Sequence, residues 1–305
     1  MINYLKTEEN FLGIEVPELF SYDSSSVVIQ SVPYEHTSSY QSGSFKGPAA
    51  IIETSHYVEF YDEELDQETF RKTGICTLEP LKFDGLFDKA AVDFIEAETL
   101  KHLNNGKFVI SLGAEHTVTY GLYKAMAQMH PDVSVLQIDA HSDLRQAYHD
   151  NPYSHASVMA RIHDHKPLIC QAGIRAQCKE EADLIKASDN IHTWYAHQIR
   201  QNTRWQDEIV KTLKPKVYIT IDADGFDPSV IPNVGTAEPG GLLWFETLEL
   251  LKKVCMEKEV VGFDIVEVAP QEGGIISEYT LAQLLYRILG YLTLNPKFNQ
   301  KYCRS

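Results

Sequence analysis

Three segments of the chain place residue types that bind metal ions directly after short apolar runs. Two of them read Asp139-Ala140-His141-Ser142-Asp143 and Asp222-Ala223-Asp224-Gly225-Phe226-Asp227-Pro228, and the third ends at His116. In an extended backbone, side chains two residues apart share a face, so we expect Asp139 and His141 about 6–7 Å apart on one side. The same holds for Asp222 and Asp224. Two cations about 3.5–4 Å apart, as in two-metal hydrolytic sites, can bridge that spacing.

The alternative is that each of these residues has only a structural role in a turn or at the surface. Carboxylates are common after strands, where they serve in turns. That explanation would have to hold at three separate apolar segments, where unpaired charges are costly to bury. Asp139, Asp143, Asp222 and Asp224 each carry one negative charge, which two divalent cations would balance. Oxygen and imidazole ligands without thiolate favour Mn²⁺ over a structural zinc, although Fe, Co, Ni and Zn also bind such sites. The sequence therefore predicts two divalent metal ions per chain, with Mn²⁺ preferred.

The elements that must position these residues alternate along the chain. Predicted strands cover residues 26–33, 108–115, 133–141, 168–175, 217–224 and 260–268, with 191–194 as a weaker candidate. Predicted helices cover residues 48–60, 88–104, 117–130, 178–187, 205–213, 245–257 and 278–293. Strands that are apolar on both faces are typical of a parallel sheet covered on each side. We expect an α/β fold with a three-layer, mostly parallel sheet flanked by helices, as one domain over residues 1–305.

Composition excludes several classes of protein. The net charge of −16 repels nucleic-acid backbones. No apolar run approaches the ~18 residues of a membrane span, and Glu8, Glu9 and Glu15 interrupt any signal-like segment at the start. The five cysteines form no Cys-x-x-Cys pair, which argues against a disulfide framework. We therefore expect a cytoplasmic protein with no nucleic-acid partner and no membrane association.

The motifs together resemble the ureohydrolase family, which includes arginase, agmatinase and formiminoglutamase. Segment 112–116 is similar to that family's Gly-Gly-Asp-His, segment 139–143 to its Asp-Ala-His-x-Asp, and segment 222–228 to its Asp-x-Asp-x-x-Asp-Pro. Segments 235–241 and 262–268 agree as well, and the resemblance runs from about Val32 to Leu289. Ala114 and Glu115 replace the usual Gly and Asp, but no ligand position is lost.

The resemblance implies a role for each site residue and an arginase/deacetylase-like fold. One metal would be held by His116, Asp139, Asp143 and Asp222, and the other by Asp139, His141, Asp222 and Asp224. A hydroxide bridging the metals would attack the guanidinium carbon, with Asp224 accepting a hydrogen bond from the attacking oxygen. Glu267 matches the carboxylate that receives the substrate guanidinium, and His155 matches the proton-shuttling histidine that protonates the leaving amine.

Within the family, the stretch from Asp143 to Met159 looks like agmatinases of one bacterial and archaeal branch. Arg145 stands where arginases carry an Asn that helps hold the amino-acid head group. The resemblance thus implies hydrolysis of agmatine to urea and putrescine, a step of polyamine biosynthesis, on a small cationic guanidino substrate. It also implies a homo-oligomer, a trimer or a hexamer.

Other substrates and other activities stay open at this point. N1-aminopropylagmatine, guanidinobutyrate, arginine or formiminoglutamate are alternatives, and loops 144–154, 175–182 and 228–241 would decide among them. Glu180, Glu181 and Glu238 in these loops fit a distal ammonium. A catalytically silent homologue would bind a polyamine or guanidine without turnover. A deacetylase would use one metal and usually a His-His pair, and a two-metal phosphatase would need more basic residues than Arg145.

Overall fold

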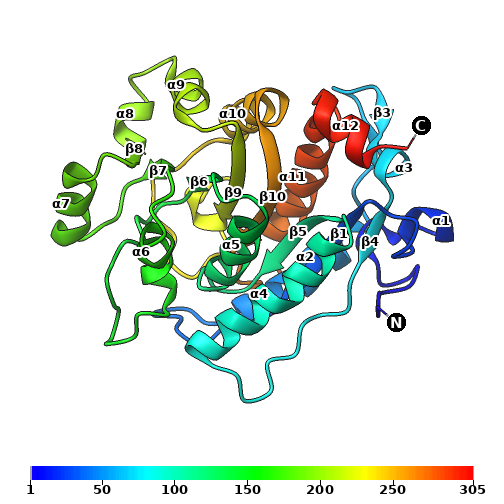
Figure 1. Cartoon of the computed structure of the whole chain (residues 1–305), viewed down its shortest axis with the longest axis horizontal. Coiled ribbons are helices and arrows are strands. Elements are labelled where there is room, and N and C mark those ends of the chain that lie inside the picture. The colour runs from blue at the N-terminus through cyan, green and yellow to red at the C-terminus, as the bar shows by residue number, and fades with distance from the viewer. Residues whose placement is uncertain (1, 305) are drawn as a thin grey trace.

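The centre of the molecule is a parallel sheet, seen in a computed structural model that describes residues 2–304 (Figure 1). Within these residues the sheet has eight strands in the order β4-β1-β5-β10-β9-β6-β7-β8, and neighbouring strands pair in parallel. The strands are β1 (Val27–Val32), β4 (Ile75–Thr77), β5 (Phe108–Gly113), β6 (Ser134–Ile138), β7 (Ile169–Ile174), β8 (Ile191–Tyr195), β9 (Lys216–Asp222) and β10 (Glu259–Val266). A separate antiparallel hairpin joins β2 (Tyr61–Asp62) to β3 (Gln67–Glu68).

Helices cover both faces of the sheet, as its two-sided apolar strands require (Figure 1). One hydrophobic core contains α2 (Gly47–Ser55), α9 (Trp205–Thr212), α10 (Trp244–Glu257), α11 (Ile276–Leu292) and α12 (Pro296–Tyr302). The other contains α4 (Asp88–Asn104), α5 (Val118–Met129), α6 (Val158–His163) and, at its edge, α7 (Lys179–Ala187). Alternate residues of one strand enter different cores: Ile110 enters the first and Val109 the second. The predicted three-layer α/β fold in a single domain is confirmed.

The predicted elements are found, with errors concentrated at short segments. All seven predicted strands are present, and the helix predicted over 88–104 matches α4. The helix predicted over 48–60 is too long, because α2 ends at Ser55. The prediction missed β4, the hairpin, and the short helices α1 (Pro17–Phe20), α3 (Thr69–Thr73), α6, α8 (Ala196–Ile199) and α12. Elements of two to seven residues contain too few periods to leave a recognisable hydrophobic pattern.

Strand order brings together segments that are far apart in the sequence. Strands β5, β10, β9 and β6 are neighbours in the middle of the sheet, although β10 is the last strand of the chain. Their carboxyl ends precede His116, Glu267, Asp224 and Asp139 respectively. Ligands of open parallel sheets bind at this edge, so the fold gathers the predicted residues where a site is expected. No helix within residues 2–304 is long and apolar enough to cross a membrane.

Candidate metal centre

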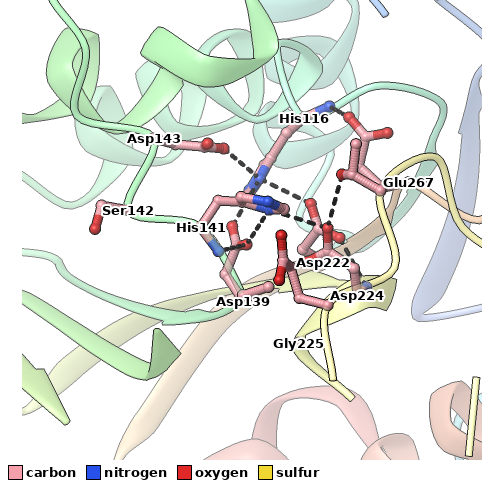
Figure 2. Close-up of polar contacts among 12 residues, drawn as sticks. His116, Asp139, His141, Ser142, Asp143, Asp222, Asp224, Gly225 and Glu267 are labelled. Carbon is pink, nitrogen blue, oxygen red and sulfur yellow. Dashed lines mark hydrogen bonds and ion pairs between the residues drawn. The ribbon is translucent and has the colours of Figure 1, made fainter. Parts of the chain in front are cut away.

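Histidine and aspartate side chains from three strand ends meet at the carboxyl edge of the sheet (Figure 2). Nδ1 of His116 lies 3.2 Å from Oδ2 of Asp139, 3.1 Å from Oδ2 of Asp143 and 3.3 Å from Oδ2 of Asp222. Nδ1 of His141 lies 3.0 Å from Oδ2 of Asp224 and 3.7 Å from Oδ1 of Asp139. Two groups of three donor atoms are close enough to share one ion each: His116 with Asp139 and Asp222, and Asp139 with His141 and Asp224.

The side chains converge for a different reason from the one predicted. The extended-backbone explanation is wrong, because β6 ends before Asp139 and a 3-10 turn follows Asp222. In each motif the first aspartate caps the turn: Oδ1 of Asp139 accepts from the backbone N of His141 (2.6 Å), and Oδ1 of Asp222 accepts from that of Asp224 (2.9 Å). Oδ1 of Asp224 also accepts from the backbone N of Ala140 (3.1 Å) and so ties the two turns together.

Close backbone packing between the two turns depends on Gly225. A Cβ atom added to Gly225 would lie 2.8 Å from the backbone N of Asp139. That separation is shorter than any ordinary contact, so the two backbones could not approach as they do with a larger residue. The glycine therefore sets how closely the Asp139 turn and the Asp224 turn approach each other.

The carboxylates are buried with little positive charge around them. Asp139 is 0% exposed and Asp222 is 3% exposed. Burial raises the pKa of Asp222 well above its ordinary value, and the nearby charges of Asp224 and Asp139 raise it further. Burial likewise raises the pKa of Asp139, and it raises that of Asp143 to about 7. Carboxylates in such surroundings favour either protonation or a bound cation.

The orientation of His116 tests whether a metal ion fits. The hydroxyl of Thr220 donates to Oδ1 of Asp264 (2.7 Å), so its oxygen is free to accept from Nε2 of His116 at 2.9 Å. A neutral His116 then carries its hydrogen on Nε2 and leaves a lone pair on Nδ1. This Nδ1 is buried without a hydrogen-bond partner and faces three carboxylate oxygens. Lone pairs that face one another need a proton or a metal cation between them. Burial lowers the pKa of His116, but the three carboxylates outweigh it and raise that pKa well above its ordinary value, so Nδ1 holds a proton when no metal is bound. A divalent metal can take the place of that proton, so the donor set fits one.

Two site residues adopt a backbone conformation that side chains rarely take. Asp143 has a φ of 52° and Glu267 a φ of 67°, both in the left-handed region. Oε1 of Glu267 accepts from the backbone N of His116 at 2.7 Å, and burial raises the pKa of Glu267 well above its ordinary value. Such strain persists where the surroundings fix one geometry, and it concentrates at functional sites.

A cavity of about 180 Å³ opens onto this cluster. His141, Asp143, Asp222 and Asp224 line it together with His155 and Glu267, and loop residues complete the wall: Ser38, Ser39, Tyr40, Gln41, Arg145, Tyr148, Ala156, Gly235 and Thr236. The sequence-predicted residues therefore share one space, except for the fully buried His116 and Asp139 behind it. Burial lowers the pKa of His155 to about 4, so its imidazole is neutral at pH 7.

Some residues around the site were missed or misjudged from sequence. Thr220 and Asp264 orient His116, and neither stood out because a threonine and an aspartate inside strands carry no recognisable signal. Glu181 is not available to a distal ammonium. Its buried carboxylate accepts hydrogen bonds from the backbone N of Leu144 (2.9 Å) and of Cys178 (2.6 Å) and holds the loops together.

The fold and this cluster define an α/β metallohydrolase with buried aspartates and histidines at the carboxyl edge of a parallel sheet. The chain matches the model of the Arginase family over residues 25–290, and it belongs to that family, the ureohydrolases. These enzymes hydrolyse amidino C–N bonds and contain two metal ions. The deacetylase and phosphatase alternatives are thereby wrong.

Several relatives share nearly the whole chain. An N(1)-aminopropylagmatine ureohydrolase of Synechocystis sp. is 38% identical over 284 residues, covering 91% of this chain and 92% of that protein. An agmatinase of Bacillus anthracis is 35% identical over 264 residues, covering 82% and 86%. Among solved structures, the agmatine ureohydrolase of Thermoplasma volcanium superposes with a TM-score of 0.80 at 26% identity, covering 95% of this chain and 96% of that one.

Proposed function

We propose that this ureohydrolase hydrolyses agmatine to urea and putrescine. The observation that carries the proposal is the position of His116 Nδ1 within 3.3 Å of three carboxylate oxygens, behind a cavity shared by Glu267 and His155. N1-aminopropylagmatine is the second candidate substrate, because relatives at 36–38% identity are named for its hydrolysis. Both molecules present the same guanidinium and differ only at the distal amine.

The ligand roles proposed for the metals follow the two clusters. His116, Asp139, Asp143 and Asp222 would hold one ion, and Asp139, His141, Asp222 and Asp224 the other, with Asp139 and Asp222 shared. The set is rich in oxygen and contains no thiolate, which supports Mn²⁺ as the native metal. When bound, a divalent ion can lower the pKa of a water molecule from 15.7 to about 7.

The remaining residues bind the substrate and move protons. Glu267 would accept charge-assisted hydrogen bonds from the guanidinium nitrogens and fix the carbon for attack. Asp224 would accept a hydrogen bond from the attacking water and orient its oxygen. A C–O bond forms, the C–N bond to the alkyl amine breaks, and the amine nitrogen must gain a proton to leave. His155, neutral at rest, would take up a proton during the reaction and deliver it to that nitrogen.

A urea assay tests the proposal directly. The purified protein is loaded with Mn²⁺ and offered agmatine, N1-aminopropylagmatine, arginine and guanidinobutyrate side by side. We expect urea from agmatine, with a stoichiometric primary amine. Failure to release urea from any of them with Mn, Co, Ni or Zn would contradict catalysis and favour a silent binding homologue. Urea from N1-aminopropylagmatine but not agmatine would establish the second candidate.

We further infer a cytoplasmic homo-oligomer, a trimer or a hexamer. Support comes only from the resemblance to enzymes of this family and from the composition of the chain. Light scattering on the metal-loaded protein would measure the assembly, and a monomer at micromolar concentration would contradict it.

A further inference from the structure

The loop that follows β1 reaches across the cavity and contacts His155. Oγ1 of Thr37 lies 3.0 Å from Nδ1 of His155 and also accepts from the backbone N of His155 at 3.1 Å. One oxygen therefore holds both the ring and the backbone of the same residue. The ring of Tyr148 meets the imidazole edge-on, with centroids 5.7 Å apart, and limits rotation from another side.

We propose that Thr37 is a positioning residue that fixes the orientation and tautomer of His155, and that Glu115 in turn fixes Thr37. The proposal deepens the function proposed above and rests on His155 as the proton-transferring group. Thr37 lies 118 residues from His155 in sequence.

Glu115 holds the loop that follows β1 through hydrogen bonds to its backbone. Its side chain is 0% exposed, and Oε2 accepts from the backbone N of His36 (2.9 Å) and of Thr37 (2.6 Å). A carboxylate that accepts two backbone hydrogen bonds in a buried setting holds those groups firmly. Glu115 stands beside His116 and, through these two hydrogen bonds, joins the segment after β5 to the loop after β1.

The proposed tautomer uses the lone pairs of the Thr37 hydroxyl. A hydroxyl has one hydrogen to donate and two lone pairs to accept with. Oγ1 of Thr37 already accepts from the backbone N of His155, and its second lone pair is 3.0 Å from Nδ1, where it can accept a hydrogen. In the proposed arrangement Nδ1 carries that hydrogen. Nε2 is left as the nitrogen that can take up and release a proton in the cavity.

The test is a pair of substitutions at Thr37, assayed with the metal-loaded enzyme and agmatine. Thr37→Val has nearly the same shape without the hydroxyl and should lower kcat about 10–100-fold, the usual effect of removing an orienting partner, while KM stays within about threefold. Thr37→Ser restores the hydroxyl and should recover kcat to within about threefold. Thr212→Val, on the exposed end of α9, is the matched control for a Thr-to-Val change far from the site.

A double-mutant cycle separates positioning from other roles. In the background of His155→Ala, Thr37→Val should cause no further loss of kcat, since the group it orients is gone. A wild-type kcat for Thr37→Val, or an equal loss in both backgrounds, would overturn the proposal. Metal content and melting temperature measured for each variant exclude a loss that comes from the metal or the fold.

A second measurement does not depend on turnover. ¹⁵N NMR of the histidine rings in the protein loaded with diamagnetic Zn²⁺ should show the Nδ1–H tautomer at His155, and Thr37→Val should lose it. If the wild type releases no urea from any guanidine, the proposed function fails while this measurement still tests the positioning. An Nε2–H tautomer in the wild type would overturn the inference even in an active enzyme.

Discussion

Two regions of the molecule contain clusters of carboxylates, and they differ in the positively charged side chains that neutralise them. In the first, Arg287 on α11 lies 2.9 Å from Asp62 and 3.1 Å from both Glu63 and Glu64, and Lys252 lies 2.7 Å from Glu64. In the candidate metal centre, the carboxylates of Asp139, Asp143, Asp222 and Asp224 contact two imidazoles and, within residues 2–304, form no ion pair with Lys or Arg. The chain supplies permanently charged side chains to the first cluster and only titratable imidazoles to the second.

The pKa values differ within each cluster. In the first, hydrogen bonds from the backbone and from Arg287 lower the pKa of Glu63, while burial raises that of Asp62 despite Arg287. In the second, burial raises the pKa of Asp222 well above its ordinary value, while for Asp224 burial is outweighed by His141 and the pKa falls to about 2. A paired carboxylate stays ionised without help, but a buried cluster of like charges needs an external cation to do so. The comparison therefore distinguishes a structural ion-pair network, which has Arg287 and Lys252, from the candidate ligand set, which has no such ion pair in the part of the chain that the structure describes.

The largest effect is expected from removing a carboxylate that both proposed metal positions share. Asp139→Ala takes a carboxylate from both proposed metal positions, so both ions should be lost and kcat should fall about 10³-fold or more. Elemental analysis and a urea assay measure the two effects. Asp62→Asn, in the Arg287 cluster, is the matched control and should keep full metal content. Two metals per chain in Asp139→Ala would show that the cluster is not the ligand set.

Removing the proton-transferring group should leave the metals in place. His155→Ala is expected to lower kcat by about 10²–10⁴-fold, the usual contribution of general acid–base catalysis, with metal content unchanged. Stopped-flow or steady-state urea measurements at saturating agmatine quantify the loss. Turnover equal to that of the wild type would reject the role of His155.

Removing the hydroxyl of Thr220, which orients His116, should lower metal affinity by an intermediate amount. Thr220→Val removes the oxygen that accepts from Nε2 of His116, so the Nδ1 lone pair is no longer fixed toward the carboxylates. Metal affinity should fall about 10–100-fold. Competition with a metal-binding dye measures it, and Thr212→Val again serves as the control. Unchanged affinity would mean that the three carboxylates alone orient the metal.

The folding stability of the metal-free protein should decrease as the pH rises. Burial raises the pKa of Asp143 to about 7. Burial lowers the pKa of His141, but the charges of Asp224, Asp139 and Asp143 together outweigh it and raise that pKa to about 11. Both groups bind more protons folded than unfolded, so stability is lost as pH rises above the ordinary pKa values of about 4 and about 6.5.

The melting temperature of the metal-free protein should therefore fall between about pH 5 and about pH 8. Metal binding needs deprotonated ligands, so the stabilisation by added Mn²⁺ should grow over the same range. Glu63 affects stability in the opposite direction. Because its pKa is lowered in the folded protein, its contribution to folding stability is lost as the pH falls. Scanning calorimetry with and without metal measures both, and a metal-free melting temperature that rises toward pH 8 would contradict the assignment.

The smallest effect is expected in the ion-pair network. Arg287→Gln leaves the buried Asp62 without its cation and should destabilise the fold by about 2 kcal/mol, between the values of surface and buried pairs. The melting temperature should fall by a few degrees, with metal content and kcat unchanged. Loss of metal in Arg287→Gln would contradict the assignment of this cluster as a structural ion-pair network that is separate from the metal ligands.

Much of the fold and the clustering of the proposed ligands could be predicted from sequence, because the signals are local. Strands that are apolar on both faces identify the parallel sheet, and His116, Asp139 and Asp222 stand next to such strands. The three-residue strand β4 was missed because it is too short to show periodicity.

Contacts between distant segments could not be predicted. Thr37 meets His155 and Thr220 meets His116 only after the sheet has formed, over separations of 118 and 104 residues. The extended-strand explanation failed at the two aspartate motifs because carboxylates there cap turns, and turn geometry depends on which backbone N–H groups lie nearby.

The strand order also determines when the centre can assemble. Every proposed metal ligand has been synthesised once Asp224 is made, yet β10, which starts at Glu259, lies between β5 and β9 in the finished sheet. His116 and Asp222 cannot reach their final separation until this last strand has inserted between their own. A nascent chain would thus emerge with a complete set of ligands and no place to hold an ion, and loading would wait until synthesis is almost finished.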